Sequence, residues 1–511
     1  MNGDTIASVI RARGRLGDRM FLVTDGDRLS YGEAEARSRR LASALLDAGV
    51  GRSSRVAMLF GNGPDFAVCF LALSRIGAIA MPISTLSTAP EIRGMLGSAD
   101  AEYLIAAPVS RGRDLRAVVS DAIGAGPDGP LLAPGLPVLR RVWFAISALE
   151  AQGAGDGTSV AAAEAAVSPA DHMIVIHTSG STSAPKGVVH THGQVIRNMA
   201  RQNLIRGYGE GECLFSNSPW FWVGGLAFSL LATLIAGARL LCSSASPKEM
   251  LDLLETERPT MTNGVASTML ALAADPSFPS RDLSSMRRGN LYPIMAPELR
   301  PADPELRYNL LGMTEIGSVY LIGDHEDDLP EAKRGSFGKP VAGVEVRIVD
   351  PVTGFDAQAG ESWVRGANVM QGYYGRERHQ CFDEDGWFHT GDMMTIDADG
   401  DFFFKGRSGD IIRTSGAQVS PREVEGAISE VSGGRLAIVV GIPDAERDQL
   451  VAAVMVGSEE IDAEAMRGAL KMRLAAYKIP RKWVTMEESE LPVLSSGKID
   501  LGRLAELAGA A

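Results

Sequence analysis

The alternation of helix and strand signals over the first hundred residues constrains the fold more than any other feature of the sequence. Residues 30–33 read SYGE, the form of a capping box, and apolar residues then recur at helical spacing until Gly49. A buried strand is expected at residues 55–60, a helix at 66–76 and the next strand at 78–82. Strands that alternate with helices favour a parallel sheet, so the predicted fold class is α/β.

The pattern changes twice toward the C-terminus, and a chain of 511 residues is long enough to form more than one domain. Short strands separated by turns are expected at residues 344–349, 362–364, 394–397 and 402–405. Beyond Gly409, helices are expected at residues 421–430 and 463–476, and strands at 436–441 and 450–456. We therefore predict an antiparallel β subdomain at about residues 335–405 and a separate α+β domain after it.

Three stretches give weaker signals. Residues 124–137 and 151–166 are rich in glycine, proline and alanine and lack a clear period, which is typical of surface connections before a strand near Met173. Residues 213–238 contain no charged side chain, but Pro219 and two glycines interrupt the run. A buried helix and strand are therefore predicted there in preference to a membrane span.

The charge balance and the cysteines argue against several classes of function. A formal net charge of −13 disfavours nucleic acid and anionic membranes as partners, because their phosphates repel an acidic surface. The four cysteines show no spacing typical of a zinc site, so reduced thiols are expected. Arginines stand near the N-terminus where a secretion signal needs an apolar segment, so a cytoplasmic location is expected.

One segment of unusual composition follows the apolar run at residues 173–176. It reads HTSGSTSAPKGVVHTH, residues 177–192, and offers backbone N–H groups, several hydroxyl groups and the ammonium group of Lys186 as donors around a phosphate. The common nucleotide-binding loop ends in Gly-Lys-Ser/Thr and opens a helix, whereas this segment continues into Val188 and Val189. On its own, the segment fits either a different kind of phosphate-binding loop or an exposed linker.

Several ordered motifs resemble those of the adenylate-forming acyl-CoA synthetases, the family that also contains luciferases and the adenylation domains of peptide synthetases. The family loop reads approximately TSGTTGxPKG after a tyrosine or phenylalanine, and residues 178–187 read TSGSTSAPKG. The resemblance extends over nearly the whole chain. It continues in GMTE at residues 312–315, HTGD at 389–392, Gly406-Arg407, Ser415-Gly416, and Pro492 followed by Gly497-Lys498.

The resemblance implies a fold and an activity. The expected fold is a large N-terminal domain at residues 1–408, with two α/β subdomains and a small β-barrel, and a mobile α+β C-terminal domain at residues 409–511. The expected enzyme is an AMP-forming acid–thiol ligase that uses ATP and Mg2+. It converts a carboxylic acid to an acyl-adenylate with release of pyrophosphate, and then transfers the acyl group to coenzyme A.

The resemblance also implies the residues of the site. The β- and γ-phosphates would be held by Thr178, Ser179, Gly180, Ser181, Thr182 and Lys186. Gly312 and Met313 would bind the nucleotide, Thr314 would contact the α-phosphate, and Glu315 would bind Mg2+. Asp392 and Arg407 would contact the ribose, and Lys498 would approach the α-phosphate and the carboxylate during adenylation. Gly409 aligns with the family hinge unless Asp410 takes that role, and Ser415 and Gly416 would belong to the face presented to coenzyme A.

The sequence departs from the family pattern at several positions near the nucleotide. Ser183 replaces a glycine of the loop, and Leu311 replaces an aromatic residue that usually stacks near adenine. Tyr292 or Tyr308 would supply a stacking face in its place, although each also fits a core tyrosine. The hinge position usually holds Asp or Lys, and the freedom of Gly409 keeps a large rotation feasible.

The acid is expected to bind near residues 218–226, SPWFWVGGL. Relatives often place histidine or an aromatic residue at the position of Trp222, so this residue, Gly224 and Gly225 are the predicted substrate pocket, although core packing alone explains two of the three aromatic residues. The absence of a carboxylate from residues 213–238 disfavours an α-amino acid and favours a fatty or aryl acid.

Two other readings of the function stay open at this stage. One is an acyl-AMP ligase that loads a carrier protein, and the other is a catalytically inactive nucleotide-binding scaffold. The expected partners are the small-molecule acid and coenzyme A, with a homodimer as an open option for assembly and with no nucleic acid and no membrane span.

Overall fold

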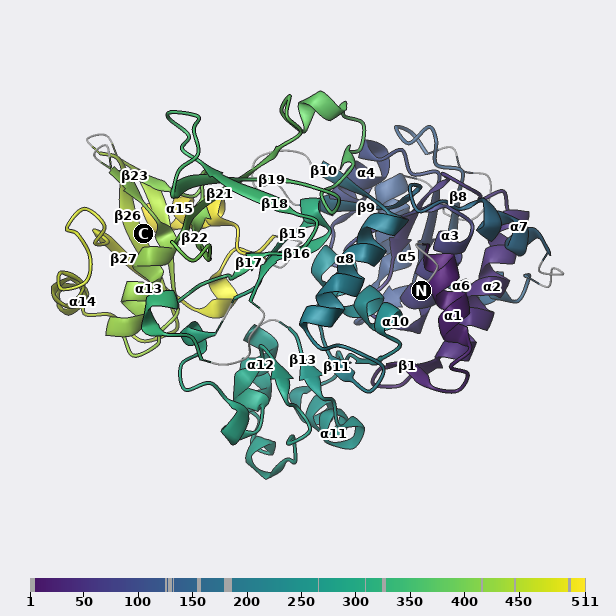
Figure 1. Cartoon of the computed structure of the whole chain (residues 1–511), viewed down its shortest axis with the longest axis horizontal. Coiled ribbons are helices and arrows are strands. Elements are labelled where there is room, and N and C mark those ends of the chain that lie inside the picture. The colour runs from purple at the N-terminus through teal and green to yellow at the C-terminus, as the bar shows by residue number, and fades with distance from the viewer. Residues whose placement is uncertain are drawn as a thin grey trace. The chain divides into compact units, whose positions relative to one another are not determined.

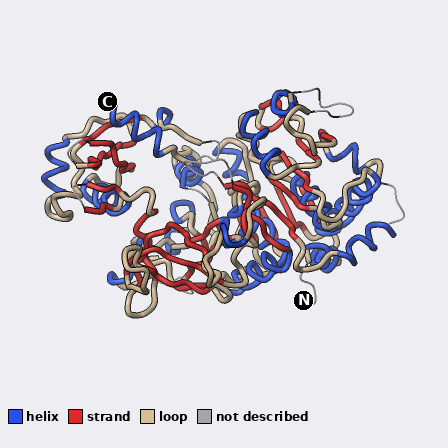
Figure 2. Tube along the Cα trace, turned by 90° about the horizontal axis from the view of Figure 1, so that it is seen from above, coloured by secondary structure: helices blue, strands red, loops and turns tan. Residues whose placement is uncertain are grey.

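The computed structural model describes residues 5–124, 126, 131, 133–153, 158–178, 186–264, 266–307, 309–323, 328–414, 417–444, 447–494 and 498–510. The chain forms two compact units, drawn in Figures 1 and 2. Unit 1 comprises Met1–Glu345 and Arg365–Gly386, and unit 2 comprises Val346–Val364 and Trp387–Ala511. The domain boundary at residues 408 and 409 stays a prediction.

A seven-stranded sheet is the centre of unit 1, with the strand order β20-β10-β9-β4-β3-β5-β8. Its strands are β3 (Arg55–Leu59), β4 (Ile79–Pro82), β5 (Tyr103–Ala106), β8 (Arg141–Phe144), β9 (His172–Thr178), β10 (Lys186–Thr191) and β20 (Gly372–Tyr373). The strands from β8 to β9 are parallel, as the alternating sequence pattern predicts. Strand β10 is antiparallel to both of its neighbours, β9 and β20.

The second large sheet of unit 1 has the order β14-β13-β11-β12-β1-β2. Its strands are β1 (Met20–Val23), β2 (Arg28–Ser30), β11 (Cys213–Phe215), β12 (Arg239–Leu241), β13 (Met261–Thr262) and β14 (Arg288–Gly289). A small antiparallel sheet follows, formed by β15 (Leu311–Met313), β16 (Ser318–Ile322) and β17 (Lys339–Pro340). A two-stranded sheet pairs β6 (Val109–Ser110) with β7 (Arg113–Asp114).

Helices cover both faces of the large sheets (Figure 1). The helices of unit 1 are α1 (Ile6–Gly14), α2 (Tyr31–Asp47), α3 (Pro64–Arg75), α4 (Ala89–Ser98), α5 (Leu115–Ile123), α6 (Ile146–Glu150), α7 (Thr158–Ala166), α8 (His192–Ile205), α9 (Val223–Gly225), α10 (Ala232–Ala236), α11 (Pro247–Glu257) and α12 (Ala266–Ala273). The predicted capping box is present, because Ser30 and Glu33 exchange hydrogen bonds at the start of α2.

Strand β3 shows why a strand between two helical layers reads as a continuous apolar run. Val56 and Met58 belong to one buried cluster, together with residues of α2 and α3, whereas Ala57 and Leu59 belong to a second cluster with residues of α4 and α5. Successive side chains of a strand point to opposite faces, so both faces need apolar residues. The predictions of strands at 55–60 and 78–82 and of a helix at 66–76 are confirmed.

The uncharged run at residues 213–238 is mostly buried, as predicted, although Gly224 is exposed. It forms β11, α9, the π-helix η1 (Leu226–Leu231) and α10, and η1 is buried along its whole length. None of the helices in the described part of the chain is both long enough and apolar enough to span a bilayer.

The prediction for residues 151–166 is wrong in part, because Thr158–Ala166 forms helix α7. The alanine-rich sequence of this stretch shows almost no amphipathic pattern, yet Val160 and Glu164 are buried. Glu164 is buried because it pairs with Arg75, a fully buried residue at the end of α3. A glutamate that faces the core for this reason looks like a surface residue in the sequence.

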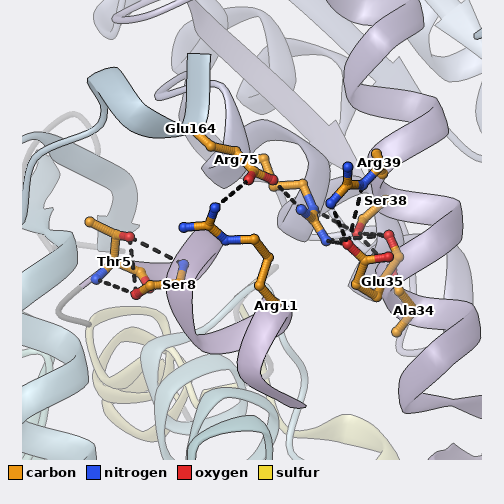
Figure 3. Close-up of polar contacts among 9 residues, drawn as sticks. All are labelled: Thr5, Ser8, Arg11, Ala34, Glu35, Ser38, Arg39, Arg75 and Glu164. Atoms are coloured by element: carbon orange, nitrogen blue, oxygen red, sulfur yellow. Dashed lines mark hydrogen bonds and ion pairs between the residues drawn. The ribbon is translucent and has the colours of Figure 1, made fainter. Parts of the chain in front are cut away.

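Figure 3 shows the ion pairs around Arg75. Glu164 binds Arg75 with one carboxylate oxygen and lies 3.4 Å from the guanidinium of Arg11 with the other. Arg75 also donates to the Ser38 hydroxyl at 3.0 Å and to the backbone carbonyl of Glu35 at 3.2 Å. The buried guanidinium of Arg75 thereby links α2, α3 and α7, and the carboxylate of Glu164 adds α1.

Unit 2 contains two sheets. The first has the order β18-β19-β21-β22 and consists of β18 (Glu345–Val349), β19 (Ala359–Arg365), β21 (Phe388–Ile396) and β22 (Phe402–Arg407). The second is formed by β23 (Ile412–Thr414), β24 (Ala417–Val419), β25 (Ala437–Asp444), β26 (Asp448–Val456) and β27 (Lys482–Met486), with helices α13 (Pro421–Val431), α14 (Ala463–Leu470) and α15 (Leu501–Ala510). The predicted antiparallel strands and the predicted α+β pattern of this region are present.

Replacement of Glu164 by alanine should destabilise unit 1 strongly. The substitution leaves the Arg75 guanidinium buried without its main counter-charge, which typically costs about 3 kcal/mol or more. Urea denaturation of the full chain measures the change. Lys248→Ala is the matched control, because Lys248 and its partner Asp252 are exposed, and this variant should lose less than about 0.5 kcal/mol. A Glu164→Ala variant as stable as the control would contradict the role of the buried pair.

Candidate active site

Strands β9 and β10 bring the two ends of the predicted phosphate loop together. Lys186 pairs with Thr178 across the ladder, and the Thr178 hydroxyl donates to the Lys186 carbonyl at 3.5 Å. The residues between them, including the predicted Ser179, Gly180, Ser181 and Thr182, lie outside the described residues. Close packing explains the glycine at position 187, because a Cβ atom there would lie 2.6 Å from Val175 Cγ1.

Strand β20 pairs with the other edge of β10 and places a tyrosine beside the loop. The N–H groups of Gln371 and Tyr374 donate to the carbonyls of Val189 and Gly187, at 2.9 and 2.7 Å. Tyr373 lies between them, with its ring centroid 5.2 Å from the Lys186 ammonium. This distance is typical of a cation–π contact.

The GMTE motif reaches the same place from another sheet. Gly312 and Met313 lie on β15, and Thr314 and Glu315 begin the short helix η6 (Thr314–Ile316). The Tyr373 hydroxyl donates to Glu315 Oε1 at 2.9 Å, and the N–H of Met370 donates to the Glu315 carbonyl at 2.7 Å. Burial raises the pKa of Tyr373, with a further contribution from the Glu315 charge, so its hydroxyl remains a donor. Lys186, Tyr373 and Glu315 therefore form one cluster in unit 1.

A second set of buried side chains fixes the turn that carries Thr314 and Glu315. His190 Nε2 lies 2.6 Å from the Thr314 carbonyl, and because a carbonyl only accepts, the ring nitrogen carries the proton. Gly317 ends the turn with φ +72°, and a Cβ atom there would lie 3.2 Å from the His190 ring. The backbone around Thr314 is thus packed against β10 as well as hydrogen-bonded to it.

Three buried amides on α8 extend this set, and we call Gln194, Asn198 and Gln202 the amide stripe. Gln194 donates to the Val369 carbonyl, Asn198 to the Ile316 carbonyl at 3.3 Å, and Gln202 to the Val319 carbonyl at 2.7 Å. The three amides recur at every fourth position of α8, which places them on one helical face. The sequence alone does not reveal the amide stripe, because polar residues at this spacing more often face solvent.

The position of Glu315 fits a magnesium ion that is bound by this carboxylate and by the phosphate oxygens of a nucleotide. In the described part of the chain Glu315 has no ion-pair partner, and its Oε2 is not the oxygen that Tyr373 contacts. No group of three or more His, Cys, Asp or Glu residues suited to hold a metal occurs among the described residues. Mg2+ commonly binds through one or two carboxylates together with phosphate oxygens and water, so a single carboxylate is sufficient.

In unit 2 the predicted ribose-binding residues form a pair. Asp392 on β21 and Arg407 on β22 are opposite one another in the ladder, and Arg407 Nε lies 3.0 Å from Asp392 Oδ1. Asp392 is buried, whereas the Arg407 side chain is 56% exposed. Gly391 adopts φ +75° just before Asp392, and its N–H donates to Glu361 at 2.9 Å. The HTGD motif is therefore part of strand β21, with a positive-φ glycine followed by a buried carboxylate.

Lys498 precedes a β-bridge residue, Ile499, near the C-terminus and is exposed. Val493 pairs with Ile499, and the Leu494 N–H donates to the Lys498 carbonyl at 2.8 Å. Gly409 is exposed in the turn after β22, with open space where a Cβ atom would be. Burial raises the pKa of Asp410, and the nearby positive charge of Arg407 offsets part of that rise. Ser415 and Gly416 lie outside the described residues.

The predicted substrate segment divides into core and accessible residues. Trp220 is fully buried against Phe66, with ring centroids 5.5 Å apart, and Phe221 is also buried. Trp222 is half-buried and meets Phe221 edge-on at 5.3 Å. Gly224 is exposed, with open space at its Cβ position.

Gly225 is the third residue of the predicted substrate pocket, and Tyr292 and Tyr308 are the predicted stacking residues near the nucleotide. A Cβ atom on Gly225 would lie 2.1 Å from the Pro219 carbonyl oxygen, so this glycine has a packing role. Tyr292 lies in a short 3-10 helix and is half-buried, and Tyr308 lies outside the described residues.

Comparisons with known proteins agree on one family. The model of the AMP-binding enzyme family matches residues 10–374, and that of the AMP-binding enzyme C-terminal domain matches residues 423–498. The chain is 31% identical to a feruloyl-CoA synthase of Amycolatopsis sp. over 94% of each chain. It is 28% identical to a 3-hydroxybenzoate–CoA ligase of Aromatoleum sp. (strain CIB), over 96% of this chain and 94% of the relative.

A solved structure supports the same fold. The crystal structure of the anthranilate CoA ligase AuaEII in complex with anthranoyl-AMP matches 99% of this chain and 97% of its own, with a TM-score of 0.83 and 22% identity. The predicted fold class, an α/β N-terminal part with a smaller α+β C-terminal part, is confirmed.

Acid should destabilise unit 1 through the buried His192. The His192 ring is fully buried, its Nδ1 accepts from the Ile6 N–H at 3.4 Å, and burial lowers its pKa to about 4. Because the folded-state pKa lies below the unfolded value, the unfolded chain binds the proton first. Stability is therefore retained above about pH 6.5 and lost as the pH falls toward 4, by at most about 3 kcal/mol.

Urea denaturation between pH 7 and pH 4 tests this prediction with two variants. His192→Asn keeps an acceptor near the position of Nδ1 and does not titrate, so its stability should fall less steeply with acid. His379→Asn removes an exposed histidine and should follow the wild type. Equal slopes for His192→Asn and the wild type would contradict the assignment.

Proposed function

The chain belongs to the AMP-binding enzyme family, and we propose that it is a carboxylic acid:CoA ligase that works through an acyl-adenylate. The observation that carries this proposal is the cluster of Lys186, Tyr373 and Glu315. It places an ammonium group at the ring face and a carboxylate at the hydroxyl of one tyrosine, beside the loop that the family uses for phosphates. A cation for phosphate oxygens and a carboxylate for Mg2+ are the two charges that binding of a magnesium nucleotide requires.

The reaction explains the need for these groups. A carboxylate is a poor electrophile, because its leaving group would be oxide, and ATP converts it to a mixed anhydride. The carboxylate oxygen attacks the α-phosphorus, and the bond from phosphorus to the bridging oxygen of pyrophosphate breaks. Negative charge on the phosphoryl oxygens must be stabilised while the reactants are held in line. Mg2+ bound at Glu315 would supply part of that charge stabilisation.

The remaining roles follow from the family motifs. Thr178, the loop after it and Lys186 hold the β- and γ-phosphates, and Thr314 donates to the α-phosphate. Asp392 accepts from the ribose hydroxyls, and the exposed Arg407 adds a donor to the same sugar. Lys498 is exposed. An exposed ammonium group is free to approach the nucleotide in one step of the cycle and to leave it in the other. In the second step the thiol of coenzyme A attacks the acyl carbon and AMP leaves.

The favoured substrate class is an aryl or other apolar carboxylic acid. The half-buried Trp222 and the open space at Gly224 provide an apolar surface, and residues 213–238 contain no charged side chain. An α-amino acid would need a buried partner for its ammonium group. The names of the relatives, a feruloyl-CoA synthase and a 3-hydroxybenzoate–CoA ligase, favour aryl acids over fatty acids.

A panel of acids tests the function. With ATP and Mg2+, we expect pyrophosphate release with aromatic acids such as cinnamic and benzoic acid derivatives, less with fatty acids and none with amino acids. Added coenzyme A should yield the thioester. Adenylate without thioester would instead support transfer to a carrier protein, and the absence of turnover on every acid would support a nucleotide-binding scaffold.

Replacement of Lys498 tests the division of labour between the two steps. Lys498→Ala should reduce adenylate formation by at least about a hundredfold, because it removes a cation from the charged transition state. Thioester formation from a preformed acyl-adenylate should change little. Lys471→Ala removes another exposed lysine of unit 2 and serves as the control. Equal loss of both steps in Lys498→Ala would contradict its role.

A further inference from the structure

Tyr373 is a buried residue at the meeting point of three chain segments, and no motif of the sequence analysis includes it. Its side chain is 9% exposed, and its backbone pairs with Val188 on β10. Its N–H donates to Cys381 Sγ at 3.5 Å. Gln371 and Tyr374 are hydrogen-bonded to β10, so the backbone on each side of Tyr373 is fixed. The ring therefore has a defined position before any ligand binds.

The ring contacts groups of both charges, including the Arg376 guanidinium, whose carbon lies 5.6 Å from the ring centroid. Its hydroxyl donates to Glu315 Oε1 at 2.9 Å, and its face lies 5.2 Å from Lys186 Nζ. Among the described residues, no ion pair joins Lys186 to Glu315, and each of the two instead contacts Tyr373. The ring thus touches a cation and an anion that do not neutralise each other.

This separation matters for a site that binds a magnesium nucleotide. If Lys186 and Glu315 formed an ion pair, the lysine would lose its availability to phosphate and the carboxylate its availability to the metal. A group that fixes a ligating carboxylate through a hydrogen bond also reduces the cost of ordering it when the metal binds. Loss of such a partner typically costs ten- to a hundredfold in metal affinity.

We propose that Tyr373 is a positioning residue for the divalent cation: its hydroxyl holds Glu315 in a ligating position, and its ring keeps Lys186 apart from that carboxylate. The inference rests on the proposed function, because it assigns Mg2+ to Glu315. It adds a residue that contacts neither phosphate nor metal and acts through two residues that do.

Metal binding provides a readout that is independent of turnover. Electron paramagnetic resonance of Mn2+ measures the affinity of the full chain for the metal in the presence of α,β-methylene-ATP, which cannot form an adenylate. Tyr373→Phe removes the hydroxyl but retains the ring, and we expect Mn2+ to bind about tenfold more weakly. Tyr373→Leu also removes the ring, and we expect it in addition to weaken binding of the analogue without metal.

The adjacent Tyr374 offers a matched control. Its hydroxyl donates to Asp100 at 3.3 Å, so Tyr374→Phe also removes one hydrogen bond from a phenol to a carboxylate. Mn2+ affinity in this variant should stay within twofold of the wild type. Because Tyr373 acts through Glu315, the double variant Tyr373→Phe/Glu315→Gln should bind Mn2+ no more weakly than Glu315→Gln alone.

Each outcome decides the proposal. Mn2+ affinity of Tyr373→Phe within twofold of the wild type, or an equal loss in Tyr374→Phe, would overturn it, as would additive losses in the double variant. A wild type that turns over acids while Tyr373→Phe binds Mn2+ normally would leave the proposed function standing and remove the inference. A wild type that binds Mn2+ with the analogue but turns over no acid would overturn the proposed function, and the Tyr373→Phe measurement would then decide the inference alone. A wild type that binds no Mn2+ would overturn both.

Discussion

Strand β10 is hydrogen-bonded on both of its edges, and the arrangement of the candidate site depends on this constraint. On one edge the pairing with β9 closes the phosphate loop, and on the other the pairing with β20 places Tyr373 next to Lys186. His190, on the same strand, holds the Thr314 carbonyl. Three segments that are far apart in the sequence are therefore positioned by one strand of six residues. Relative displacement of any of them would break backbone hydrogen bonds as well as side-chain contacts.

Buried polar groups, and not apolar packing alone, determine this arrangement. The amides of the stripe donate to carbonyls of the segment before β20, of the turn at Ile316 and of strand β16. A buried carbonyl without a donor costs about 1–3 kcal/mol, so alternative arrangements of these segments are disfavoured. The Arg75 group serves the same purpose among the helices. Such groups add little net stability and make wrong packings expensive.

The sequence predicts much of the fold and part of the site. The strands near residues 55 and 78 and the capping box at Ser30 were predictable, because local spacing determines them. Helix α7 was not, because Glu164 is buried by a partner in another helix. The motif residues Lys186 and Glu315 were identified by resemblance, but Tyr373 and the amide stripe act through contacts across 58 or more residues. Those contacts leave no local pattern in the sequence. The roles of Lys498 and Asp392 remain predictions.

A crystal structure of the full chain with Mg2+ and α,β-methylene-ATP tests the central claim most directly. The account predicts that the phosphate oxygens lie within hydrogen-bonding distance of Lys186 Nζ and that Mg2+ is bound to Glu315 Oε2. The Tyr373 hydroxyl should still donate to Oε1. A nucleotide bound away from β10, or a metal with no contact to Glu315, would contradict the account.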